Sequence, residues 1–198
     1  MSDVIDTLVG ITPGSPLDKV RARRPESRKH AQVSYAGLFE PSEPGGVSLV
    51  ERFAVASFVA GLHGRPETDT FYSGKLAEAG ASADLRAAIA AEIAAAKTAG
   101  PYGSYPKGPL SGENTTGPVH RVASGAREKL GKRLAAAFEH THMLVFHPRD
   151  AASPSLQSML DSGWSTTDIV VLSQLVSFLA YQIRNVAGLR TLSATPAS

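Results

Sequence analysis

Residues 48–62 read SLVERFAVASFVAGL, and this stretch decides the fold. Ser48 precedes Glu51 by three residues, the spacing of a capping box, in which each side chain binds the backbone N–H of the other residue. The residues after this start are apolar or small on every side of a helix. Because a helix that is apolar all round belongs in a protein core, residues 47–64 are predicted to form a central helix.

A second stretch, residues 165–179, repeats this pattern with the sequence STTDIVVLSQLVSFL. Ser165 and Asp168 form the aspartate variant of the capping box. The offset of 117 residues from Glu51 to Asp168 also pairs Phe58 with Leu175 and other apolar positions over three helical turns. The repeat predicts a duplicated helical unit with two buried helices, although any two buried helices with capping boxes would match equally well.

The rest of the chain shows helical periodicity and almost no strand-like alternation. Helices are expected at 17–38 with a break at Pro25, and at 66–76, 82–98, 122–144, 156–160 and 166–189. Residues 99–118 hold five glycines and four prolines, which predicts a flap or a linker. The fold class is therefore all-α, with a helical arm at 1–46 that is frayed before residue 17, units at 47–98 and 121–192, a connection at 99–120, and a tail at 193–198, loose from Thr191.

Composition excludes several classes of function. The chain has 198 residues and no cysteine, so disulfides, thiolate metal sites and thiol nucleophiles are ruled out. The N-terminus lacks the pattern of a signal peptide, and no run approaches 18 apolar residues, so we expect a cytoplasmic protein without a membrane span. Six basic residues lie within 19–29, but Asp18 and Glu26 interrupt the charge and the total charge is only +2, so no nucleic-acid partner is expected.

Two residues of the first capped stretch are candidates for acid/base chemistry. Glu51 satisfies the helix start, and burial would raise its pKa enough to exchange protons near neutral pH. His63 stands at the other end of the helix, where a cation also stabilises the helix dipole. Twelve residues of helix span about 18 Å, so the two side chains need a further segment or subunit to act together.

His140, His142 and His147 form the densest group of potential metal ligands. His140 and His142 point to different sides if this segment is helical, and no HExxH spacing is present. We therefore expect histidines that pack at a helix end, with metal binding as the alternative, and no cofactor.

Residues 49–56, with residues 162–169 and the later Tyr181-Gln182-Ile183-Arg184 and Gly188-Leu189, resemble the carboxymuconolactone decarboxylase and alkylhydroperoxidase D-like superfamily. The resemblance covers roughly residues 30–192 and implies a helical bundle of duplicated units that assembles as a homotrimer or homohexamer. In the peroxidase branch the glutamate is followed by a Cys-x-x-Cys pair and a histidine. Here Glu51 matches, but His63, Pro66 and Thr70 occupy the other three positions, so thiol peroxidase activity is not expected.

The decarboxylase branch works without thiols or cofactors. By resemblance, the expected function is acid/base chemistry on a small carboxylated or lactone substrate, with Glu51 and His63 as catalytic groups and Arg52 or Arg184 as the carboxylate-binding group. The alternative is a non-catalytic helical oligomer that binds a ligand or a partner.

Overall fold

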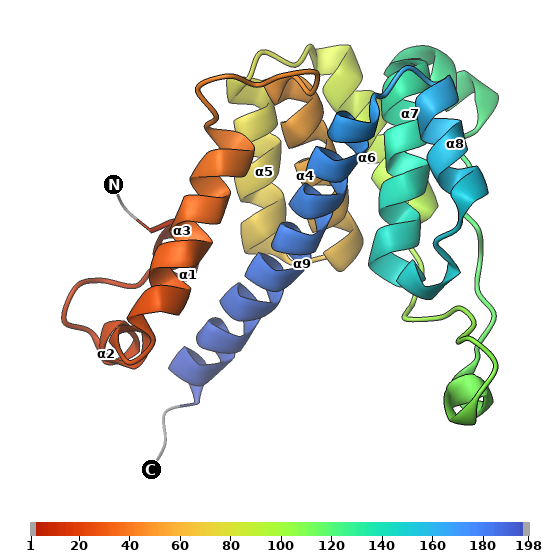
Figure 1. Cartoon of the computed structure of the whole chain (residues 1–198). Helices are drawn as coiled ribbons and strands as arrows, with labels where there is room; N and C mark the ends of the chain where they lie inside the picture. The colour runs from red at the N-terminus through yellow and green to blue at the C-terminus, as the bar shows by residue number, and fades with distance from the viewer. Residues whose placement is uncertain (1–2, 196–198) are drawn as a thin grey trace.

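The computed structural model describes residues 3–195, which form nine α-helices (Figure 1). They are α1 (Val4–Val9), α2 (Pro16–Ala22), α3 (Pro25–Phe39), α4 (Leu49–His63), α5 (Pro66–Glu78), α6 (Ala83–Ala96), α7 (Ser124–Phe146), α8 (Ser153–Asp161) and α9 (Thr166–Ala194). Two 3-10 turns, η1 (Pro109–Glu113) and η2 (Pro148–Asp150), complete the structure of these residues. The prediction of an all-α fold is confirmed.

Helix α4 is the centre of the molecule, as its sequence predicts. Every residue from 52 to 62 is buried, and α5, α6, α7 and α9 all pack against this helix. The predicted capping box is present, because Ser48 N donates to Glu51 Oε2 at 2.9 Å and Glu51 N donates to Ser48 Oγ at 3.3 Å. The helix ends at Gly64, whose φ of +62° is a left-handed conformation that suits glycine.

Helix α9 starts at the second predicted capping box, where Ser165 N donates to Asp168 Oδ2 at 2.9 Å. The prediction that this helix is buried is correct for one of its faces only. Leu175 and Leu179 are fully buried, but Val170 is 55% exposed and Tyr181 is 41% exposed, because neighbouring helices cover only one side of α9. By length and composition alone α9 is long and apolar enough to cross a membrane, and half of its most apolar window is buried inside the protein.

Both ends of the chain are more ordered than predicted. The N-terminal residues form α1, which buries Val4, Ile5 and Leu8 against α3 and α9, so the expectation of a frayed start is wrong. Residues 191–194 continue α9, so the tail is helical over these positions, while residues 196–198 lie outside the described part. The basic segment is partly neutralised, since Arg21 pairs with Asp3 at 3.0 Å and Arg28 pairs with Asp18 at 2.8 Å.

Candidate functional site

Glu51 is held by the first turn of α4 and by a second helix. Its Oε2 accepts hydrogen bonds from the backbone N–H and the hydroxyl of Ser48, each at 2.9 Å. Its Oε1 accepts from Arg133 Nε of α7 at 2.9 Å, and the Arg133 guanidinium stacks on Trp164 at 3.8 Å from the ring centre. Oε2 therefore caps α4, while Oε1 joins α4 to α7 through Arg133, which also donates to Gly163 O just before α9.

His63 lies at the opposite end of α4, twelve residues further on. Its Nε2 is buried without a hydrogen-bond partner in the described residues. Burial, reinforced by the charges of Arg184 and Arg65, lowers the pKa of His63. The structure does not bring Glu51 and His63 together, since α4 is a continuous helix between them. Their catalytic roles remain a prediction from sequence.

The two arginines expected to bind a carboxylate differ in their surroundings. Arg52 is buried and donates from Nε to Val47 O at 2.9 Å, from Nη1 to Leu38 O at 2.7 Å and from Nη2 to Pro44 O at 2.8 Å. It therefore fastens the turn between α3 and α4. Arg184 is exposed on α9 and donates to the carbonyl oxygen of Ala180 in its own helix at 3.3 Å.

Histidines that are paired with carboxylates lie at a different place from Glu51 and His63. They lie at a cavity of about 410 Å³ that we call the histidine pocket. It forms where the end of the 99–120 connection passes over α7 and α8. Its lining residues are Val119, His120, Arg121, Ala136, Glu139, His140, Met143, His147, Asp150, Ala152, Pro154, Ser155 and Ser158. A volume of this size suits a small organic molecule.

The first histidine–carboxylate pair of this pocket is His147 with Asp150. His147 Nδ1 lies 3.1 Å from Asp150 Oδ2, and since a carboxylate only accepts, Nδ1 carries the proton. The opposite nitrogen, Nε2, is buried with no hydrogen-bond partner among the described residues. This arrangement fixes the tautomer in the way that a carboxylate orients the histidine of a catalytic triad.

The 99–118 connection holds this pair in place. The ring of Tyr102 stacks on His147 with 4.9 Å between the ring centres, and Ser104 N donates to Asp150 Oδ1 at 2.9 Å. Tyr102 is itself fixed by a hydrogen bond of 2.6 Å from its hydroxyl to Pro118 O. The first and last parts of the connection are therefore fastened to the pocket, while η1 projects from the helical body (Figure 1).

The second pair is His120 with Glu92, which comes from α6. His120 Nε2 donates to Glu92 Oε1 at 2.7 Å, and the Glu92 side chain is only 4% exposed. The two pairs therefore use opposite ring nitrogens, and in each histidine the other nitrogen is not bound by the carboxylate.

His142 lies between the two pairs, with its ring centre 5.0 Å from that of His120 and 5.9 Å from that of His147. Burial, followed by the influence of His120 and His147, lowers the pKa of His142 to about 4. It is therefore neutral at pH 7, and its Nε2 donates to Ala96 O at 3.2 Å. His142 supports the two outer histidines but does not line the cavity itself.

His140 also lines the histidine pocket, but its partner is a hydroxyl and not a carboxylate. Its Nε2 lies 3.1 Å from Ser173 Oγ, and burial lowers its pKa. As the helical reading of the sequence predicts, His140 and His142 point to different neighbours. Among residues 3–195 no three His, Asp or Glu side chains are grouped so as to hold a metal ion. The arrangement of His140, His142 and His147 thus offers acid/base groups rather than a ligand set.

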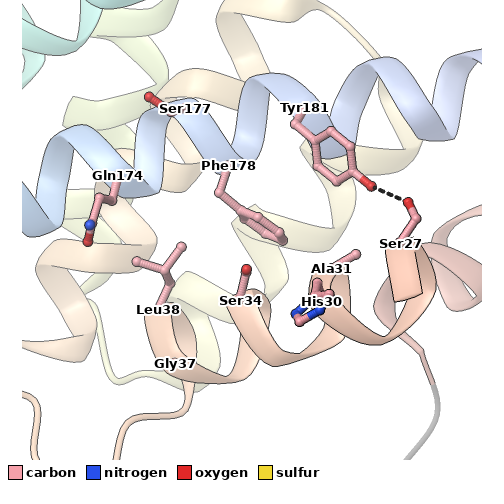
Figure 2. A pocket seen from close by; sticks show the side chains of 10 residues that line it. All are labelled: Ser27, His30, Ala31, Ser34, Gly37, Leu38, Gln174, Ser177, Phe178 and Tyr181. Atoms are coloured by element: carbon pink, nitrogen blue, oxygen red, sulfur yellow. Dashed lines mark hydrogen bonds between the residues drawn. The ribbon is translucent and has the colours of Figure 1, made fainter. Parts of the chain in front are cut away.

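A larger cavity, of about 760 Å³, lies between α3 and α9 (Figure 2). Phe178 and Leu38 face each other across it, and Ser27 and Tyr181 meet at one end with 3.5 Å between their oxygens. Its lining contains no carboxylate, and its one histidine, His30, meets Glu26 at 3.4 Å in a contact in which both side chains are at least 70% exposed. The histidine pocket is therefore the better candidate for a reaction site, although it is smaller.

One residue of the sequence, Glu92, indicates this site. Glu92 is the only charged residue between Arg86 and Lys97, and it lies three residues after Ile89 on the buried face of α6. A carboxylate on the apolar stripe of an alanine-rich helix requires a buried partner. His120 carried no comparable signal, because it stands in the connection, 28 residues from Glu92.

Comparison of the chain with protein-family models, with curated proteins and with solved structures gives no match.

Proposed function

We propose that this protein catalyses cofactor-independent acid/base chemistry on a small carboxylated or lactone substrate, and that the reaction takes place in the histidine pocket. The observation that carries the proposal is the presence of two histidine–carboxylate pairs, His120–Glu92 and His147–Asp150, on one cavity. Proton transfer at a carbon atom requires a base that removes a proton and an acid that returns one, and two histidines in one small cavity can fill these roles.

His147 is the proposed general base. Its Nε2 has no protein partner to displace, and the Asp150 carboxylate stabilises the positive charge that forms when Nε2 takes a proton from substrate carbon next to a carbonyl. The electron pair of the broken C–H bond then passes to that carbonyl. The imidazolium form of His120, stabilised by Glu92, is the proposed acid that returns a proton to the substrate.

The remaining lining suits a small anion with an apolar body, because the carboxylate of Glu139 is already paired with Arg127. Val119, Ala136 and Met143 supply apolar surface, while Arg121 supplies a guanidinium at the rim. The side chain of Arg121 is 70% exposed and meets Glu139 only at 3.5 Å. Because this contact is loose and solvated, Arg121 is free to turn toward a substrate carboxylate.

We also propose that the chain is a cysteine-less relative of the carboxymuconolactone decarboxylase and alkylhydroperoxidase D-like superfamily, with two duplicated helical units. The support is the shared construction of α4 and α9, which start at equivalent capping boxes and pack against each other. In this proposal the reaction site has moved away from the Glu51 position to the histidine pocket.

The test is solvent deuterium exchange into a panel of carboxylated lactones and their open-chain hydroxy acids, followed by ¹H NMR in D₂O. With a substrate that exchanges, His147→Gln and His120→Gln should each slow the reaction by roughly 10²–10⁴-fold, the usual contribution of a general acid or base. His30→Gln, at an exposed histidine of α3, is the matched control and should leave the rate unchanged.

The same assay separates this proposal from the site expected at α4. If the reaction takes place in the histidine pocket, Glu51→Gln should keep the exchange rate of the wild type. If Glu51 is catalytic, the exchange rate of this variant should fall. Full activity in both pocket variants, or its loss in Glu51→Gln with the fold intact, contradicts the assignment to the histidine pocket.

A further inference from the structure

Helix α9 exposes a stripe of four uncharged residues, Val170, Gln174, Ser177 and Tyr181. Their spacing of four, three and four residues is the 3.5-residue period of a helix-pairing seam. No charged residue occurs from Ile169 to Ile183, although the exposed sides of α3 and α5 carry several charges. A solvated helix face normally carries charge, so this stripe has the character of a contact surface.

Grooves lie on both sides of the stripe. The groove toward α3 has a volume of about 760 Å³ (Figure 2), and the groove toward α8 has a volume of about 670 Å³. Gln174 and Ser177 line both grooves, so they form the ridge between them. Leu156 and Leu160 add exposed apolar side chains on the α8 side. A ridge with grooves beside it is the surface that a second helix of the same shape can fill.

The charges at the two ends of the α3 groove are opposite in sign. Where Ser27 meets Tyr181, the exposed arginines Arg24 and Arg184 form no ion pair within residues 3–195, while the exposed Glu26 there is paired with Lys29 at 3.7 Å. Where α3 ends beyond Leu38, Glu40 and Glu43 are exposed and likewise form no ion pair within these residues. A copy of the same surface turned end to end would therefore bring unlike charges together at both ends.

We infer that this face binds a second copy of the chain, with the two α9 helices antiparallel about a two-fold axis between Gln174 and Ser177. Antiparallel pairing sets Val170 opposite the partner's Tyr181 and the Glu40 end opposite the partner's Arg184 end. With the axis at this place the two α9 helices overlap over residues 166–185, so a face of two helix widths by this length, about 20 Å by 30 Å, covers about 600 Å² per subunit, which is at the lower end of stable interfaces. This inference does not depend on the proposed function.

A two-fold contact of this kind limits the assembly. It pairs subunits, so it produces a dimer, or a hexamer if a separate three-fold contact is added. It does not produce a trimer alone. Of the two assemblies that the family resemblance implies, the α9 contact is therefore compatible only with the hexamer.

Sedimentation equilibrium of the full chain tests the inference. Gln174→Arg places like charges next to the two-fold axis and should weaken self-association at least 10-fold. Ala94→Arg adds the same charge to an exposed position of α6 and should leave the association unchanged. Circular dichroism and melting temperature of each variant establish that the fold is retained.

A charge exchange makes the test specific for the antiparallel arrangement. Arg184→Glu should weaken the association, and the double variant Arg184→Glu with Glu40→Lys should restore it. A monomeric wild-type chain, an equal effect of Ala94→Arg, or no recovery in the double variant overturns the inference. A monomer that binds neutral phosphatidylcholine vesicles through α9 would also overturn the inference, since that result assigns the uncharged stripe to a lipid surface.

Discussion

His120 Nε2 lies 2.7 Å from Glu92 Oε1, although the two residues come from a Gly/Pro-rich connection and an alanine-rich helix that are 28 residues apart. Both side chains are at most 10% exposed. Because both groups are buried, water does not compete for the hydrogen bond between them. The proposed chemistry depends on this hydrogen bond.

Glu92→Gln tests the role of this pair. The amide keeps the shape and can still accept a hydrogen bond, but it cannot stabilise a charged imidazolium. We expect turnover to fall by roughly 10–10³-fold with a stability loss of only about 1 kcal/mol, because one charged hydrogen bond becomes neutral. Steady-state kinetics and urea denaturation of the same preparation measure the two effects. Unchanged turnover would remove Glu92 from the mechanism.

Gly117→Ala tests whether the connection positions His147. A Cβ at residue 117 would lie 2.4 Å from the ring of Tyr102, so the ring must move and its stacking on His147 is disturbed. We expect a lower kcat. Gly112→Ala in the same connection is the matched control, since its Cβ meets nothing within 4 Å. If the two variants have equal kcat, Tyr102 does not position the base.

Arg52→Met tests the structural role of the buried arginine. The substitution leaves the carbonyl oxygens of Leu38, Pro44 and Val47 without their donors in a largely buried turn. An unsatisfied buried polar group costs about 1–3 kcal/mol, and we expect a total loss of about 3 kcal/mol because water reaches part of the turn. Chemical denaturation gives this value. A stable variant with an increased substrate KM would instead support the carboxylate-binding role predicted from sequence.

His142 predicts a loss of stability at acidic pH. Burial and its neighbouring histidines hold the pKa of His142 at about 4 in the folded state, below its value of 6.5 in an unfolded chain. Protonation therefore favours unfolding, so this contribution is present above pH 6.5 and is lost as the pH falls toward 4. Between pH 7 and pH 5 the loss from His142 is about 2 kcal/mol.

Denaturation of His142→Met at both pH values checks this prediction. The variant should lose less stability on acidification than the wild type, while His30→Gln at an exposed position should behave as the wild type does. The lowered pKa values of His63 and His140 act in the same direction, so some acid sensitivity should remain. An unchanged pH dependence in His142→Met would show that His142 is not buried as a neutral group.

The helices were predictable because their signals are local. Ser48 and Glu51 specify the start of α4 within four residues, and the apolar sequence that follows specifies its burial. The break at Pro25 between α2 and α3 was predicted for the same reason. In contrast, the exposed side of α9 could not be predicted, because the sequence shows which residues are apolar but not how many neighbours are available to cover them.

The site was less predictable than the fold. His147 was recognised as a chemically capable residue, but its partner Asp150 was not, and the pair is completed by Tyr102 and Ser104 from a connection that looked structureless. Such contacts depend on where α6, α7 and the connection meet. Glu51 and His63, which the sequence placed on one helix, are kept apart by that same helix.

The most direct measurement of the central claim is ¹H–¹⁵N NMR of the imidazole nitrogens in the histidine-labelled protein, with titration of a carboxylated lactone that undergoes exchange. The account predicts that His147 carries a proton on Nδ1 and His120 carries one on Nε2, and that the resonances of His147 Nε2 and His120 Nδ1 shift in a saturable way as the lactone binds, while those of His30 do not. The opposite tautomers, or a lactone that is turned over without moving either resonance, would contradict the assignment of the reaction to the histidine pocket.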